Sequence, residues 1–89
     1  MISNTDKSKI LELTRKYGIE KILLFGSSLE DREESNDIDL AVEGIQGSLF
    51  FKFYGELILN LSKLVDLVDL KKKSKFNELI RAEGVVLND

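Results

Sequence analysis

The sequence predicts a small α/β (α+β) fold in which a mixed sheet is flanked by helices. A chain of 89 residues is long enough for one domain. Hydrophobic residues make up 43% and charged residues 33%, which is typical of a folded globular chain. Short apolar runs alternate with segments of helical periodicity. We therefore expect a single domain over residues 1–89, in the order α-β-β-α-β-α with a possible terminal strand.

The first quarter of the chain predicts a helix followed by a buried strand. Residues 1–17 open on Ser3, Asn4 and Thr5, which are good N-cap residues, and continue with apolar residues at helical spacing. Gly18 is a typical helix stop. The apolar run 21–25 then predicts a strand that ends at Gly26, and the acidic stretch 29–36 predicts an exposed loop.

Two further strands are expected at 37–43 and 64–70. The first alternates strictly, which predicts one apolar and one mixed face. Its two faces carry Ile38, Leu40 and Val42 on one side and Asp37, Asp39 and Ala41 on the other.

Two more helices are predicted in the second half of the chain. One covers residues 48–62, and the other is capped by Ser74, runs to about Glu83 and ends at Gly84. The apolar stripe of the first, which we expect in the core, comprises Phe50, Phe53, Tyr54, Leu57, Ile58 and Leu61. Beside it, Phe51, Gly55 and Leu59 are spaced by four. A mid-helix glycine usually has a packing reason, so we expect this flank to contact another chain, either a twin subunit or a helical partner.

The composition excludes several classes of function. The chain has no cysteine and no histidine, which rules out zinc fingers and Ser-His-Asp or Cys-His catalysis. A net charge of -3 argues against broad binding of nucleic acid through phosphates. The lysines at 71–75 predict a solvated segment or, alternatively, a patch for phosphate or a partner. No apolar run approaches the length of a membrane span, so we expect a cytoplasmic protein without membrane contact.

Three aspartates predict a metal site. Asp37 and Asp39 leave the same face of their strand, with roots about 6 to 7 Å apart. Asp66 lies between apolar neighbours on an expected core strand, where an isolated carboxylate is costly to bury. If the two strands are neighbours, the three carboxylates meet, and all-oxygen ligands favour Mg²⁺ or Mn²⁺. Asp69 is the alternative third acid, but it lies nearer the strand end, where it is easily solvated.

A phosphate site is predicted at Gly26 and Ser27. They follow a strand and are expected to open a short helix, whose free N–H groups attract phosphate. Glycine lets a phosphate approach the backbone, and serine adds a hydroxyl donor. A phosphate site beside a carboxylate pair that holds two metal ions favours nucleotidyl transfer.

These segments together resemble the minimal nucleotidyltransferase (MNT) family of the DNA polymerase β superfamily. The resemblance rests on three motifs in the expected order, namely Leu24-Phe25-Gly26-Ser27, Asp37-Ile38-Asp39-Leu40 and Val65-Asp66-Leu67-Val68. It implies a polymerase-β-like fold in which Gly26 and Ser27 bind the triphosphate. It further implies that Asp37 and Asp39 bind two Mg²⁺ ions, and that Asp66 is the third catalytic carboxylate and metal ligand.

The resemblance also implies a reaction and a partner. It implies an NTP donor, which is ATP in the better-understood members, and transfer of an adenylyl group to a hydroxyl. Relatives of this size are often antitoxins paired with a helical HEPN partner, and some neutralise it by AMPylating a tyrosine. We therefore expect Mg²⁺-dependent AMP transfer to a HEPN-type partner protein; a homodimer is the other assembly considered.

Two other functions stay open. The segment after Ser27 carries acidic residues where the family commonly has arginine, so the alternative is a catalytically weakened, nucleotide-binding antitoxin that neutralises its partner by binding alone. An enzyme that modifies small molecules is the third class, and it would need a further domain to hold the acceptor.

Overall fold

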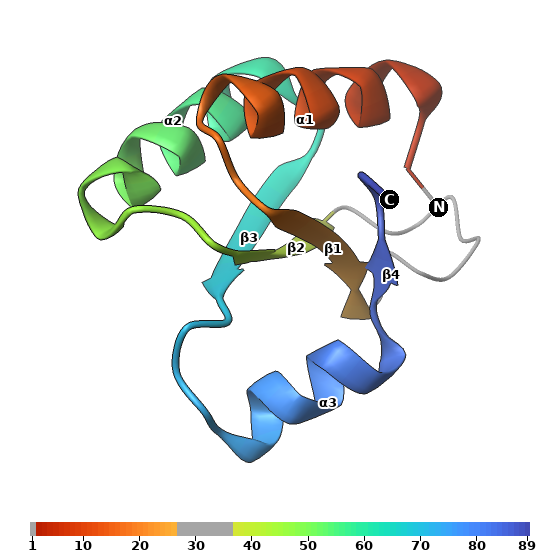
Figure 1. Cartoon of the computed structure of the whole chain (residues 1–89). Helices are drawn as coiled ribbons and strands as arrows, with labels where there is room; N and C mark the ends of the chain where they lie inside the picture. The colour runs from red at the N-terminus through yellow and green to blue at the C-terminus, as the bar shows by residue number, and fades with distance from the viewer. Residues whose placement is uncertain (1, 27–36) are drawn as a thin grey trace.

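A four-stranded sheet lies between two helices on one face and one helix on the other (Figure 1). The computed structural model describes residues 2–26 and 37–89. In chain order the described elements are α1 (Asn4–Lys16), β1 (Lys21–Phe25), β2 (Asp37–Glu43), the short 3-10 turn η2 (Gly47–Leu49), α2 (Phe50–Asn60), β3 (Leu64–Asp69), α3 (Lys75–Glu83) and β4 (Val85–Val86). The predicted element order and the terminal strand are confirmed.

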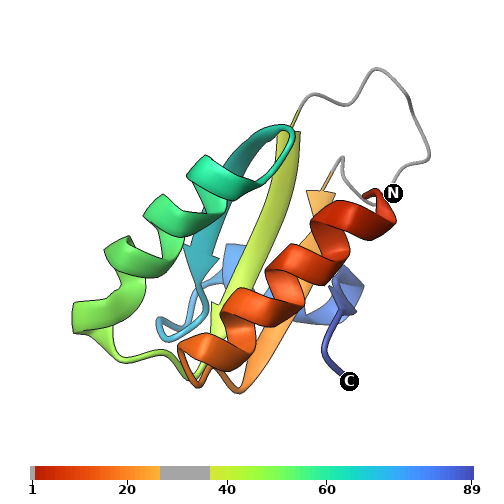
Figure 2. The same cartoon turned by 90° about the horizontal axis from the view of Figure 1, so that it is seen from above.

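The sheet is mixed, as predicted, with strand order β3-β2-β1-β4. Strand β1 pairs antiparallel with β2 and with β4, whereas β2 and β3 are parallel. Parallel neighbours need a long crossover, and α2 provides it over one face of the sheet (Figure 2). Strand β3 consequently lies at an edge, next to β2.

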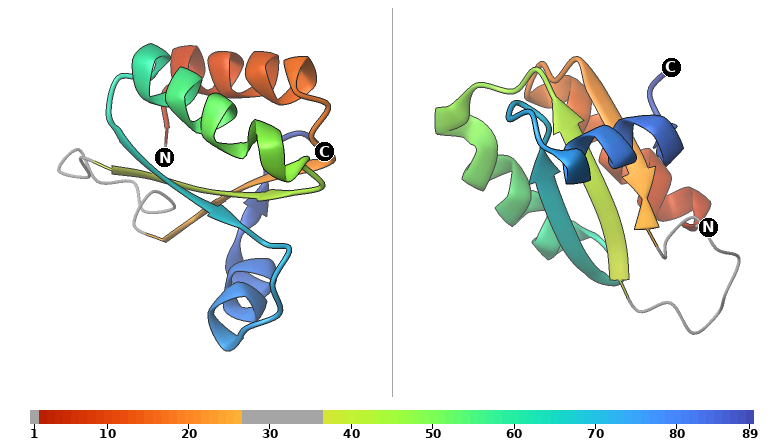
Figure 3. Two further views of the ribbon diagram at one scale, coloured as in Figure 1. Left: turned by 90° about the vertical axis from the view of Figure 1, so that its left-hand side faces the viewer. Right: turned by 90° about the horizontal axis from the view of Figure 1, so that it is seen from below.

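Alternation along the strands creates two apolar layers. The larger layer lies between the sheet and α1 and α2, and its fully buried members include Ile10, Ile22, Leu24, Leu40, Phe53 and Leu57. The smaller layer lies between the sheet and α3 and is built on Leu23, Ala41, Leu70 and Ile80. Figure 3 shows α3 alone on this second face. The odd-numbered residues of β2 therefore point toward the α3 side of the sheet.

The helix ends follow local chemistry that the sequence shows. The Ser3 hydroxyl accepts from the Asp6 amide at the start of α1, and the Ser74 hydroxyl accepts from the Asn77 amide at the start of α3. Gly18 has a φ of 64°, the left-handed conformation that commonly follows a helix. These caps confirm the predicted helix starts and stop.

Helix α2 is shorter than predicted, and one residue of its expected core stripe is exposed. The turn η2 replaces the first helical residues, and Leu61 already has extended backbone at the other end. Phe53 and Leu57 are fully buried, but Ile58 is 54% exposed, so its assignment to the core was wrong. The apolar contact face of α2 is narrower than the run of apolar residues, because α1 and the sheet cover only one side of the helix.

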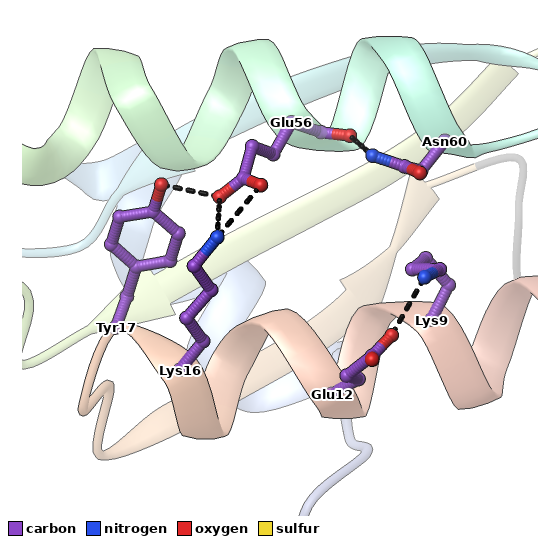
Figure 4. Close-up of polar contacts among 6 residues, drawn as sticks. All are labelled: Lys9, Glu12, Lys16, Tyr17, Glu56 and Asn60. Atoms are coloured by element: carbon purple, nitrogen blue, oxygen red, sulfur yellow. Dashed lines mark hydrogen bonds and ion pairs between the residues drawn. The ribbon is translucent and has the colours of Figure 1, made fainter.

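Polar contacts tie α1 to α2 on the surface of the larger layer (Figure 4). The Lys16 ammonium lies 3.0 Å from Glu56 Oε1, and the Tyr17 hydroxyl donates to Glu56 Oε2. At the other end, the buried Asp6 carboxylate accepts from both the amide and the hydroxyl of Ser62. The pair of helices is thus joined at both ends.

The flank of α2 formed by Phe51, Gly55 and Leu59 faces outward. Phe51 is 79% and Leu59 85% exposed, and a side chain added at Gly55 would meet nothing within 4 Å. This fits the expected contact with another chain, which stays a prediction. In the part of the chain that the structure describes, no helix has the length and hydrophobicity needed to cross a membrane.

Candidate active site

A row of three side chains crosses the sheet on the α3 side. In the strand register Phe25 pairs with Asp39, and Asp39 pairs with Asp66. Paired residues of neighbouring strands point to the same face and lie about 5 Å apart. The predicted pair Asp39 and Asp66 is therefore brought together, and Asp37 lies two residues before Asp39 on the same face.

Gly26 lies against the carboxylate of Asp39. A Cβ atom built on Gly26 would be 2.5 Å from Asp39 Oδ2, so a side chain at this position would force the Asp39 carboxylate to shift. Gly26 also has a φ of 66°, which favours glycine. The motif glycine thus meets two demands at once, a left-handed backbone and the close approach of a motif carboxylate.

Asp66 is exposed, not buried as predicted. The sequence suggested a core strand because its neighbours are apolar. Strand β3 is an edge strand, and its α3 side is open to solvent at Asp66, whereas Val65 is buried toward α2 and its carbonyl accepts from the Tyr54 hydroxyl. The cost of burying a charge therefore gives no argument for a metal at Asp66.

The alternative acid, Asp69, has another role. It pairs with Val42, on the opposite face from Asp66, and its carboxylate accepts from the Lys71 amide at the end of the strand. The carboxylate of Asp66 makes neither a hydrogen bond nor an ion pair with another described residue, so no lysine of the described ranges neutralises it. Asp66, unlike Asp69, shares the face of Asp39, and its choice as the third acid stays a prediction.

The donor set suits a hard cation, although no metal site stands ready. Asp37, Asp39 and Asp66 offer only carboxylate oxygens, which Mg²⁺ prefers. Within residues 2–26 and 37–89, no group of three or more metal-ligating side chains is close enough to hold an ion. Asp39 and Asp66 are paired by the strand register, and Asp37 lies two residues before Asp39 on the same face of the sheet.

Part of the predicted site lies outside the described residues. This holds for Ser27, the second residue of the expected triphosphate pair, for the short helix it was to open, and for the acidic stretch that follows. The role of Ser27 in binding triphosphate stays a prediction from the sequence.

The structure adds an apolar pocket that the sequence did not indicate. It has a volume of about 170 Å³ and is lined by Phe25, Gly26, Phe76, Leu79, Ile80 and Glu83. The rings of Phe25 and Phe76 meet edge to face at 6.1 Å. The periodicity of α3 predicts its apolar face, but it does not predict that this face lies against Phe25 and Gly26 at the end of β1.

The fold and this site define a nucleotidyltransferase of the polymerase β type. A family model described as "Polymerase beta, Nucleotidyltransferase" matches residues 8–89, and the chain belongs to this family. The resemblance predicted from the three motifs is confirmed. A comparison with the curated proteins found no match.

Several solved structures are similar to this chain over nearly its whole length. A toxin–antitoxin crystal structure with AMP-PNP has 30% identity and a TM-score of 0.73, covering 91% of this chain and 71% of that one. An MntA–HepT toxin–antitoxin complex has 26% identity and a TM-score of 0.71, covering 96% and 71%. A tri-AMPylated Shewanella oneidensis HEPN toxin in complex with its MNT antitoxin has 27% identity and a TM-score of 0.69, covering 92% and 68%.

Proposed function

We propose that this chain is an antitoxin that transfers AMP from ATP to a hydroxyl group on a HEPN-type partner protein, in the presence of Mg²⁺. The observation that carries the proposal is the register of β2 and β3, which sets Asp39 beside Asp66 while Gly26 lies against Asp39. The similar complexes support the partner and the nucleotide, because their descriptions include a HEPN toxin, AMPylation and AMP-PNP.

The residues of the candidate active site have different tasks in this proposal. Asp37 and Asp39 would hold Mg²⁺, with Asp66 as the third carboxylate ligand. Gly26, with Ser27, would let the triphosphate lie close to the backbone. Bound Mg²⁺ would neutralise the triphosphate charge and lower the pKa of the attacking hydroxyl. The acceptor oxygen then bonds to the α-phosphorus, pyrophosphate leaves, and Asp66 takes the hydroxyl proton.

The exposure of Asp66 is compatible with this task. A carboxylate that receives a proton from a substrate on another protein has to be reachable from outside, and β3 is the strand at the sheet edge. Asp39 is only partly exposed, and Gly26 leaves room for its carboxylate, which suits a metal ligand.

The test is the mass of the partner after incubation with the chain and Mg-ATP. We expect the wild type to add AMP, and Asp39→Asn or Asp66→Asn to reduce the rate about a hundredfold or more, as is typical when one electrostatic group is removed from an active site. Asp69→Asn is the matched control, because it lies on the same strand but on the other face. An unchanged rate in Asp66→Asn, or an equal loss in Asp69→Asn, would contradict the assignment.

The second candidate is an antitoxin that neutralises its partner by binding alone. The acidic segment after Ser27 favours it, because negative charge beside a phosphate site repels the incoming triphosphate. The two candidates differ in one result: if Asp37→Asn and Asp39→Asn still neutralise the toxin in cells, transfer is not required.

A further inference from the structure

Two exposed apolar patches lie on opposite sides of the sheet. The α2 patch comprises Phe51, Ile58 and Leu59, on the side away from the aspartates. The α3 patch comprises Phe76 and Leu79, which are 55% and 53% exposed. Helix α3 covers the side on which Asp39 and Asp66 lie (Figure 3). Only the α3 patch shares a surface with the candidate active site.

The α3 patch surrounds the apolar pocket between α3 and the end of β1. Its volume of about 170 Å³ is close to that of a cavity that takes up benzene, roughly 150 Å³, and well below the roughly 300 Å³ or more of pockets for larger ligands. Ile80, which is 3% exposed, forms part of the lining, and the Phe25 and Phe76 rings form two of its walls. The pocket therefore has room for one apolar side chain.

The pocket adjoins the catalytic row. Phe25 is the register partner of Asp39, and Gly26 touches both the pocket and the Asp39 carboxylate. A side chain of the acceptor protein can reach this place, because the acceptor hydroxyl has to approach the same face of the sheet.

The charge around the α3 patch specifies the partner further: Glu83 lies in the pocket lining, whereas lysines precede Phe76 at the start of α3. Lys71, Lys72, Lys73 and Lys75 lead into α3 and are all exposed. None of their side chains forms an ion pair with another residue of the described ranges. A second copy of this chain would set these lysines against the same lysines in a symmetric contact of two α3 patches, which like charge disfavours. An acidic segment of another protein complements them.

We propose that the α3 patch and its pocket dock the acceptor protein through one apolar side chain flanked by acidic residues. This inference rests on the proposed function, since the acceptor hydroxyl has to approach the face that carries Asp39 and Asp66. A central apolar anchor in a pocket with a charged rim is the usual form of a protein interface.

The experiment measures the dissociation constant for a HEPN-family partner protein, with Asp39→Asn as the background so that no transfer occurs. Phe76→Glu is expected to weaken binding at least tenfold, because it puts a carboxylate into the anchor pocket. Lys72→Glu is expected to weaken it severalfold, with a reduced dependence on salt. Leu59→Glu is the matched control on the α2 patch and should change binding less than twofold.

The outcomes that overturn the proposal are equally specific. The proposal is wrong if Phe76→Glu leaves the dissociation constant unchanged, or if Leu59→Glu weakens binding more than Phe76→Glu does. It is also wrong if Phe76→Glu changes the oligomeric state of the isolated chain, or if the wild type forms no complex. Phe76→Ala removes the ring without adding charge, so it tests the same contact if Phe76→Glu fails to fold. Melting curves of all variants show which of them are folded.

Failure of the proposed function would look different. Binding of Mg-ATP to the isolated chain tests the nucleotide site without the partner. If nucleotide is not bound but Phe76→Glu still weakens the complex, docking stands and AMP transfer falls. If nucleotide is bound and Phe76 has no effect on the complex, the docking proposal alone falls.

Discussion

The absence of a side chain at Gly26 sets how closely the Asp39 carboxylate approaches the backbone. The two requirements at this residue, a positive φ and room for Asp39, are separable because Gly18 shares only the first. Gly18 has a φ of 64°, and a Cβ there would meet nothing within 4 Å.

We expect Gly26→Ala to lower stability more than Gly18→Ala. Both variants bear the cost of a left-handed alanine, about 1 to 2 kcal/mol, which corresponds to roughly 4–8 °C in melting temperature per kcal/mol for a chain of this size. Only Gly26→Ala also displaces Asp39, so only it should lose affinity for Mg-ATP. Calorimetry and a nucleotide titration check this, and equal behaviour of the two variants would contradict the role of the close contact.

Residue types and spacing were sufficient to predict that Asp37 and Asp39 share a face of their strand and that the preceding strand ends at Gly26, because strand alternation and turn chemistry are local. The exposure of Asp66 was not predictable in this way. An apolar strand reads the same whether it lies in the middle or at the edge of a sheet, and strand order depends on contacts between distant segments. The pocket at Phe25 was not predictable for the same reason, because α3 and β1 are distant in the sequence and come together only in the folded chain.

At the scale of elements, Glu56 joins α2 to the end of α1. Its pKa is lowered first by the hydrogen bond from the Tyr17 hydroxyl and then by that from the Lys16 ammonium. The pKa values of Tyr17 and Lys16 are raised, mainly by the same hydrogen bonds. The stabilisation from a lowered carboxyl pKa is present above the unfolded-state pKa and is lost as the pH falls through the folded-state value.

The difference in stability between the wild type and Glu56→Gln should therefore shrink as the pH drops below about 4.3, the ordinary glutamate value. It should also shrink at strongly alkaline pH, as Tyr17 loses its proton. Denaturant unfolding across the pH range measures the difference. In Tyr17→Phe, NMR titration should find the pKa of Glu56 moved upward, and a value that stays put would contradict the ordering of causes.

Most elements were predictable because their signals are local: the caps at Ser3 and Ser74, the alternation of β2, and the apolar run of β1. The exposed Ile58 shows where this fails. The stripe on α2 is wider than the surface that α1 and the sheet cover, and only the placement of neighbouring elements decides which edge of a stripe is left in solvent.

For the whole molecule, a ligand that binds only the folded state shifts the unfolding equilibrium. Mg-ATP at a hundredfold excess over its dissociation constant should stabilise the chain by about 2.7 kcal/mol. A melting curve with Mg²⁺ alone and one with ATP and a chelator are the controls, because the carboxylate row and the phosphate site are expected to act together. Indifference of the melting temperature to Mg-ATP would argue against both.

The parallel pairing of β2 with β3 also governs when the site comes into being. Asp39 and Asp66 become neighbours only after α2 has crossed the sheet and β3 has docked, and such non-local pairing closes late in folding. During synthesis, a ribosome-bound chain that has emerged only as far as α2 contains Gly26, Asp37 and Asp39 but not yet Asp66, the register partner of Asp39. The candidate site is therefore assembled in one step, when β3 pairs with β2.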